Sequence, residues 1–357
     1  MEPSVISQER KATIRVAAPS IPTAYDSPMN ACVALGIFPD LSKNTWRGGK
    51  LMARNYRRIV TGSCAVAVWG LLGTMILRGQ APAQAGDLPF RYEELTAPDF
   101  VKAVEKAGRT CVIPFGILEK HGPHLPLGTD LLDSRQIALR AAKQEYVLVF
   151  PEYYFGQIYE AKHQPGTIAY SPTTTWTLLE ETCDELSRNG IKKIVIVNGH
   201  GGNNNFLNYF CQAQLAARKD YAVMVFTPPR DTESETKIRQ MRKTTMEMHA
   251  GEGETSTMMA HRPDLAHAER AKQQSGEDQG RLKGIEGLYA GIWWYARFPN
   301  HYAGDGTLAT KELGETMIQA QVSQLIKVLQ QIKRDDRILE LQERFFGEAE
   351  NPLATRQ

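Results

Sequence analysis

The stretch TCVIPFGILEKHGPHLPLGTD, residues 110–130, joins an apolar run to a polar segment rich in glycine and proline. The apolar residues 110–116 predict a buried β-strand. Open α/β sheets bind ligands beyond the carboxyl ends of their strands, so the polar groups that follow are candidates for a site. Glu119 and His121 lie two positions apart, on the same side of an extended segment, and Asp130 can fold back after the turn. Carboxylate and imidazole groups together suit zinc, manganese or iron(II), and a plain polar turn is the alternative.

Further apolar runs alternate with amphipathic stretches along the chain. The other candidate strands cover residues 146–150, 193–199 and 221–226. Helical spacing indicates helices over 134–143, 174–189 and 205–217, and a last helix with the apolar stripe Ile318, Val322, Leu325, Leu329 and Ile332. We therefore expect a three-layer α/β/α fold with a mainly parallel central sheet. Two polar segments are interpreted as a surface loop (272–284) and a charged tail (333–344).

Composition limits the class of protein. The chain has 357 residues, 42% of them hydrophobic, and a formal net charge of +2, which suits one large domain with a sizeable core. It has no run of five Lys or Arg residues and no basic stripe interleaved with aromatics, so we expect no nucleic-acid partner. The five cysteines occur singly, without a CxxC pair, and are interpreted as small buried apolar residues rather than a disulfide framework.

Residues 52–85 have the order of a secretory signal. Arg54, Arg57 and Arg58 precede an uncharged apolar span over 59–77, which is followed by the small-residue site Ala83-Gln84-Ala85. The span is also long enough to cross a bilayer, so an uncleaved membrane anchor over 59–77 is the alternative. We predict an exported protein, periplasmic or extracellular, that meets a membrane only through this segment if it is not cleaved.

This signal sets the expected domain boundaries. Residues 1–51 precede it and are interpreted as a non-native or disordered extension from a misassigned start. The catalytic domain is expected over 86–345 and a tail over 346–357.

Three later segments also place histidines beside glycine-rich turns. IVIVNGHGGNNN (194–205) puts His200 among glycines directly after a predicted strand. MHAGEGETSTMM (248–259) brings His249, Glu252 and Glu254 close to a predicted helix start, where Glu252 is better suited than Glu254 to stabilise the helix terminus.

The sequence around the remaining histidines gives less support for a role as metal ligands. EAKHQPGTIAYSP (160–172) carries His163, which we assign to the pocket wall. His124 is interpreted as turn packing, and His261, His267 and His301 as ordinary surface or packing residues.

The segments GILEKHGPHLPLGTD, HQPGTI, NGHGGN and HAGEGETS are similar, in order and separation, to the motifs of the creatininase (creatinine amidohydrolase) family. The resemblance covers about residues 95–330 and implies a single α/β domain, usually assembled into hexamers, with two metal ions at the carboxyl edge of the sheet. It further implies that Glu119, Asp130 and His200 hold one ion and that His121 with a bridging Asp130 holds the other. The substrate-side histidine of the family matches His249.

The chain departs from creatininase at two positions. Gly202 stands where creatininase has a glutamate ligand to the second metal, and Met248 stands where it has a glutamate before the substrate-side histidine. Both differences argue against creatinine as the substrate. Glu254 is our candidate for the missing metal ligand.

The expected chemistry is hydrolysis of a carbon–nitrogen bond in a small amide, cyclic or of the formyl type. Two divalent ions per subunit (Zn, Mn or Fe) would activate a water and polarise the carbonyl oxygen. We expect His249 and Glu254 to be catalytic, with His249 holding the tetrahedral intermediate or passing a proton to the leaving nitrogen. The aromatic residues Trp293 and Trp294, with His163 and His249, are predicted to contact the substrate.

Two other functions remain open on the sequence. One is a non-enzymatic binding protein of the same fold with a single structural metal. The other is a peptide-processing relative, similar to the branch of the family that trims a carboxyl-terminal dipeptide from a cofactor precursor; the secretory signal speaks against it.

Overall fold

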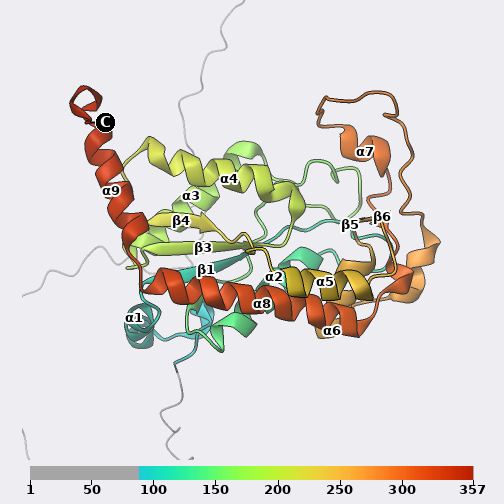
Figure 1. The fold of residues 1–357 in the computed structure, drawn as a ribbon, viewed down its shortest axis with the longest axis horizontal. Coiled ribbons are helices and arrows are strands. Elements are labelled where there is room, and N and C mark those ends of the chain that lie inside the picture. The colour runs from blue at the N-terminus through green and yellow to red at the C-terminus, as the bar shows by residue number, and fades with distance from the viewer. Residues whose placement is uncertain (1–87, 357) are drawn as a thin grey trace, which may run out of the picture. The chain divides into compact units, whose positions relative to one another are not determined.

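A sheet of four parallel strands forms the centre of the computed structural model, which describes residues 88–356 (Figure 1). The strands follow the order β2-β1-β3-β4 and comprise β1 Thr110–Phe115, β2 Leu148–Val149, β3 Lys193–Asn198 and β4 Ala222–Val225. The predicted parallel sheet is confirmed, although the strand expected over 146–150 has only two residues. Phe115 pairs with Asn198, so β1 and β3 end side by side and the polar segments after them leave the same edge.

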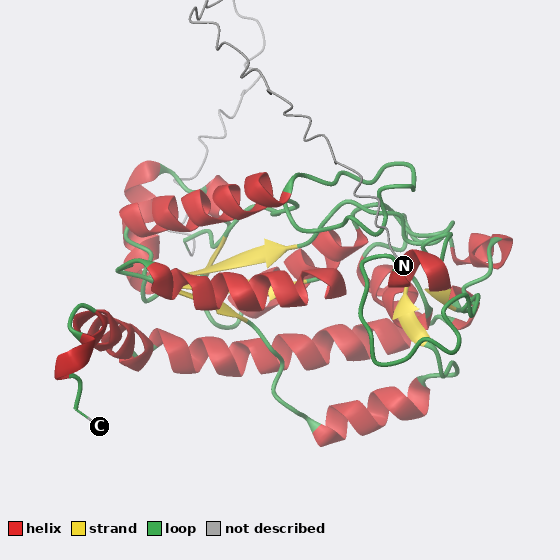
Figure 2. Cartoon of the chain, turned by 90° about the horizontal axis from the view of Figure 1, so that it is seen from above, coloured by secondary structure: helices red, strands yellow, loops and turns green. Residues whose placement is uncertain are grey.

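Helices cover both faces of this sheet and complete the expected three layers (Figure 2). On one face, α1 (Ala97–Lys106), α3 (Pro172–Arg188) and α4 (Asn204–Ala213) share a buried cluster with Ile113 and Ile196. On the other, α2 (Thr129–Ala142) and α8 (Lys311–Lys333) share a cluster with Val112 and Val195. Successive strand residues point to opposite faces, so each strand supplies apolar side chains to both clusters.

The other helices lie outside these two layers or beside the site. They are α5 Thr232–Met241, α6 Glu252–His261, α7 Trp293–Arg297 and α9 Arg337–Ala349. Single 3-10 turns occur at Tyr92–Glu94, Gly201–Asn203, Gln214–Ala216, Ala268–Gln273, Gly306–Leu308 and Pro352–Ala354. A small antiparallel sheet of β5 (Glu247–His249) and β6 (Ala303–Gly304) pairs His249 with Ala303 and thereby joins two distant segments.

Local signals explain where the predicted helices begin and end. α3 starts at Pro172 after Ser171, whose side chain accepts a hydrogen bond from the Thr174 amide at 3.2 Å. α2 begins at Thr129 rather than at 134, because the first helical hydrogen bond runs from the Leu132 amide to the Gly128 carbonyl at 3.0 Å. Asp130 therefore lies in the first turn of a helix.

The charged segment 333–344, expected as a tail, is helical instead except for residues 334–336. It forms the end of α8 and most of α9, in which Phe346 is buried while Gln342 donates a hydrogen bond to the Tyr221 carbonyl at 2.7 Å. The apolar residues of α9 recur at helical spacing among its charges, which is the pattern of an amphipathic helix. The segment 272–284 is mainly an exposed loop, as predicted.

Three of the cysteines lie in the described region and none of these three is in a disulfide. Cys111 and Cys183 are buried and Cys211 is partly buried, in agreement with their interpretation as core residues. The extension over 1–51 and the signal or anchor over 52–85 lie outside the described residues. Within residues 88–356, no helix combines the length and apolar character needed to span a membrane.

Candidate metal centre

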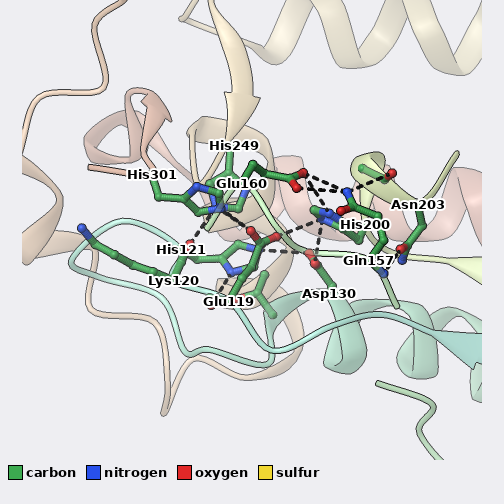
Figure 3. Close-up of polar contacts among 12 residues, drawn as sticks. Glu119, Lys120, His121, Asp130, Gln157, Glu160, His200, Asn203, His249 and His301 are labelled. Carbon is green, nitrogen blue, oxygen red and sulfur yellow. Dashed lines mark hydrogen bonds and ion pairs between the residues drawn. The ribbon is translucent and has the colours of Figure 1, made fainter. Parts of the chain in front are cut away.

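Ionisable side chains from four segments converge beyond the carboxyl ends of β1 and β3 (Figure 3). Glu119 and His121 follow β1, Asp130 begins α2, His200 follows β3 and His249 ends β5. The turn after β3 approaches α2 closely because residue 199 is glycine. A Cβ atom there would lie 2.2 Å from the carbonyl oxygen of Asp130.

Glu119, Asp130 and His200 form the first buried group. Nδ1 of His200 lies 2.9 Å from Glu119 Oε1 and 3.4 Å from Asp130 Oδ2. Both oxygens are buried and have no hydrogen-bond partner among the described residues. Buried carboxylate oxygens require positive charge beside them, which either a protonated His200 ring or a metal ion would supply. The three ligand atoms lie within 4.8 Å of one another, close enough to bind a single metal ion.

The second group shares Asp130 and adds His121 and Glu254. Nε2 of His121 lies 3.0 Å from Asp130 Oδ1 and 3.9 Å from Glu254 Oε2. Nδ1 of His121 lies 3.2 Å from the Glu119 carbonyl oxygen, to which it can donate its proton. With Nδ1 protonated in this way, Nε2 donates a second proton to Asp130 Oδ1 in the metal-free protein and would become the ligand atom when a metal replaces that proton. Asp130 directs one oxygen to each group, as a carboxylate that bridges two metal ions does.

Histidines also surround the second oxygen of Glu119. Nε2 of His301 lies against Glu119 Oε2, and Nε2 of His249 lies 3.8 Å from the same atom. His249 Nε2 lies 2.8 Å from the Lys120 carbonyl, so it carries the proton and leaves Nδ1 bare, 3.8 Å from Glu254 Oε2. Glu119, His121 and His249 make a third group with metal-ligand spacing.

Burial and close charges shift the pKa values of this cluster. Burial alone would lower the pKa of His121, but the adjacent Asp130 carboxylate outweighs it and raises that pKa to about 10. Burial also opposes protonation of His200, yet the Glu119 carboxylate holds its pKa well above the usual range. Without a metal, protons on these two rings therefore take the place of a cation.

Burial is the main cause of the pKa shifts of two other residues in the cluster. Desolvation raises the pKa of Glu254 to about 8, although 31% of its side chain is exposed, and lowers the pKa of His249 to about 3. His249 is thus a neutral ring at pH 7.

A cavity of about 320 Å³ gives access to these groups; its lining includes Glu119, His200, His249, Glu254, Trp293 and Trp294. The two tryptophans therefore lie where a substrate would reach them. His163 lines a neighbouring outer cavity of about 700 Å³ instead, and its Nε2 is 2.7 Å from the Pro299 carbonyl.

The remaining polar residues of these motifs have structural partners. His124 is buried with Nε2 2.8 Å from Thr255 Oγ1, consistent with packing in the turn. Glu252 is buried and accepts hydrogen bonds from the amides of Lys243 and Thr244, so it ties a loop to the start of α6.

Two residues near the metal groups escaped the sequence reasoning. His301, interpreted as an ordinary surface or packing residue, is 1% exposed and in contact with Glu119. Glu160, for which no role was predicted, places Oε1 3.8 Å from Nε2 of His200. Both lie in irregular loops, where no periodic pattern or motif spacing marks them.

The chain is similar to several known proteins. A model of the creatininase family, described as creatinine amidohydrolase, matches residues 93–329. Creatinine amidohydrolase of Pseudomonas putida is 28% identical over 191 residues, which cover 50% of this chain and 74% of that protein. The mycofactocin precursor peptide peptidase of Mycolicibacterium smegmatis is 35% identical over 98 residues, or 26% of this chain and 39% of that protein.

Solved structures support the fold. A crystal structure of creatininase aligns with a TM-score of 0.59 and 22% identity, covering 69% of this chain and 98% of that one. Comparable creatininase structures include a manganese form and a zinc form of a variant.

Proposed function

This chain belongs to the creatininase family, and from that premise we propose that it is a metal-dependent amidohydrolase that cleaves a carbon–nitrogen bond of a small amide. The observation that carries the proposal is the pair of three-residue groups that share Asp130. Their imidazole and carboxylate donors fit zinc or manganese, the metals of the related creatininase structures. The unpartnered oxygens of Glu119 and Asp130 support the presence of a cation there.

Glu119, Asp130 and His200 would hold one ion, and His121, Asp130 and Glu254 the other. Divalent ions bound here would lower the pKa of a water molecule and polarise an amide carbonyl. In this assignment Glu254 supplies the carboxylate that is absent at position 202. Its Oε2 also accepts a hydrogen bond from the Ala250 amide at 2.6 Å, which fixes the orientation of the carboxylate.

His249 is suited to hold the substrate through a neutral ring. The Lys120 carbonyl fixes the proton on Nε2, and the pKa lowered to about 3 keeps Nδ1 bare at neutral pH. A bare Nδ1 at the cavity wall can accept a hydrogen bond from an N–H group of the substrate. Trp293 and Trp294 would form the apolar wall beside the substrate and limit the access of water.

Metal content and activity test this proposal together. The full chain is loaded with Zn²⁺ or Mn²⁺, assayed with a panel of cyclic amides and formamides, and compared with His200→Ala and Asp130→Ala. We expect metal-dependent hydrolysis that both substitutions abolish, with metal loss. Full metal content and activity in both variants would refute the proposal. Bound metal with no hydrolysis of any substrate would favour the non-enzymatic binding protein.

A peptide-processing activity is the second candidate, because a second cavity adjoins the one at the metal groups. The outer cavity of about 700 Å³ shares Gln157, Glu160, Gly202, Asn205 and Tyr289 with the inner one. A substrate that occupied both adjoining cavities would be longer than a small ring. Mass spectrometry of peptides incubated with the loaded protein would reveal a clipped product, which small-amide hydrolysis does not give.

We also propose that the protein is exported and forms a homohexamer. The signal-like order of residues 52–85 supports export, and family membership supports the assembly. Amino-terminal sequencing of the natural protein and its mass in solution test the two points. A mature chain that begins upstream of Met52 would rule out the proposed start, and a monomeric mass would rule out the hexamer.

A further inference from the structure

The two ring nitrogens of His200 have different surroundings. Nδ1 faces the carboxylates of Glu119 and Asp130, on the side of the proposed metal. Nε2 points the other way; it is buried and has no hydrogen-bond partner among the described residues. If Nδ1 binds a metal, the proton of the neutral ring must be on Nε2. A buried N–H group in that position requires an acceptor.

The carboxylate of Glu160 is positioned to be that acceptor. Its Oε1 lies 3.8 Å from Nε2 of His200, and the side chain extends toward the ring in Figure 3. Glu160 belongs to the loop between β2 and α3, far from β3 in sequence. A small rotation of either side chain would bring the two atoms into hydrogen-bond distance.

Hydrogen bonds hold Glu160 to the same turn that carries His200. The Gln157 side chain donates to both oxygens of Glu160, at 3.2 and 3.0 Å. The Gln157 backbone amide donates to Asn203 Oδ1 at 2.9 Å, and the Asn203 amide donates to the His200 carbonyl at 3.1 Å. The carboxylate is therefore held near the imidazole rather than free in the cavity.

Gly202 leaves the space that this carboxylate occupies. A Cβ atom at residue 202 would lie 2.7 Å from Glu160 Oε1 and 2.3 Å from His200 Nε2. A side chain at 202 and the observed position of Glu160 thus exclude each other. Glu160 can therefore occupy this position only because residue 202 has no side chain.

From these contacts we propose that Glu160 is a positioning residue, which accepts the Nε2 proton of His200 and keeps Nδ1 directed at the metal. The inference rests on the metal site of the proposed function. Histidines that bind metals commonly donate their second ring proton to a carboxylate, and loss of that partner costs about 10- to 100-fold in metal affinity.

The test measures zinc affinity in the full chain by competition with a chromophoric chelator. We expect Glu160→Leu to weaken binding by about 10- to 100-fold, and Glu160→Gln to weaken it less because its amide oxygen can accept the same proton. Glu181→Gln, on an exposed position of α3, is the matched control and should bind zinc like the wild type.

A second readout follows the imidazole directly. In zinc-loaded protein labelled with ¹⁵N-histidine, the Nε2 proton resonance of His200 should shift in Glu160→Gln relative to wild type. Unchanged zinc affinity in Glu160→Leu together with an unshifted resonance would overturn the proposal. A rise in KM with unchanged zinc affinity would also overturn it, in favour of a substrate contact. The zinc affinity and the His200 resonance need no hydrolysis, so an inactive protein still gives an answer from these two measurements.

Discussion

The imidazole of His301 lies against the carboxylate of Glu119, although 182 positions separate the two residues in the chain. Trp294 donates its Nε1 proton to Nδ1 of His301 at 2.8 Å, so the proton on Nε2 is the one that meets Glu119 Oε2. This contact turns the other oxygen, Oε1, toward Nδ1 of His200. His301 thus orients a proposed metal ligand without belonging to any of the three groups with metal-ligand spacing.

Substitution of His301 should weaken metal binding. We expect His301→Ala to lower zinc affinity by about 10- to 100-fold, because Glu119 loses the donor that fixes its orientation. Trp294→Phe should have a smaller effect, since it removes only the donor that selects the tautomer of His301. Isothermal titration of both variants measures the difference. Equal affinity in His301→Ala and wild type would show that Glu119 needs no such partner.

The adjacent residues Gly201 and Gly202 should differ in their tolerance of a side chain. A Cβ at residue 202 meets His200 and Glu160, whereas one at residue 201 has nothing within 4 Å. We therefore expect Gly202→Ala to lose at least about tenfold in zinc affinity and Gly201→Ala to behave like the wild type. Chelator competition on both variants checks this. A loss of similar size in both would point to the flexibility of the turn rather than to crowding at the site.

Metal binding should release protons. The pKa of His121 is raised to about 10 and that of His200 lies well above its usual value, so both rings are protonated at pH 7 in the metal-free protein. The pKa of Glu254 is raised to about 8, so this proposed ligand also carries a proton at pH 7. A metal must displace the protons of all three residues, so affinity should rise with pH and about three protons should leave per bound pair of ions. Titration calorimetry in buffers of different ionisation enthalpy counts them. Proton release near zero would contradict the assignment of these ligands.

Loss of the metal should destabilise the fold. A ligand that binds only the folded state at 100 times its Kd adds about 2.7 kcal/mol to the free energy of unfolding. A chelator should therefore lower the melting temperature of the wild type. Asp130→Asn, which lacks the shared carboxylate, should melt earlier without chelator and respond less to it. An equal chelator response in both proteins would exclude Asp130 as a ligand.

His124 should make the protein sensitive to acid. Burial, followed by the nearby His121, lowers its pKa to about 4, against 6.5 for the ordinary side chain. Between these values the unfolded chain binds more protons, so this contribution to stability is complete above pH 6.5 and is lost as the pH falls toward 4. His124→Gln should unfold with a shallower pH dependence in that window, measured by urea denaturation. An unchanged slope would mean that His124 does not titrate there.

Most of the strands and helices could be predicted from local patterns in the sequence. Apolar runs such as 193–199 predicted strands, and helical spacing predicted α3 and α8, because burial of one face follows from the order of side chains. The order of residues also placed Glu119, His121 and His200 directly after predicted strands. This indicated that they meet at the carboxyl edge of the sheet. The helical character of 337–349 was missed because its charges outweighed its apolar residues in the pattern.

Which residues make up the site could be known only from the tertiary structure. His301 and Glu160 lie in irregular loops, and loops carry no periodicity from which the direction of a side chain could be inferred. Their partners are fixed by the pairing of β1 with β3 and of β5 with β6, which brings distant segments together. The sequence by itself determined the fold class and which side chains could ligate a metal. Only the packed chain decided which oxygen faces which nitrogen, because those distances depend on the adjacency of strands rather than on the order of residues.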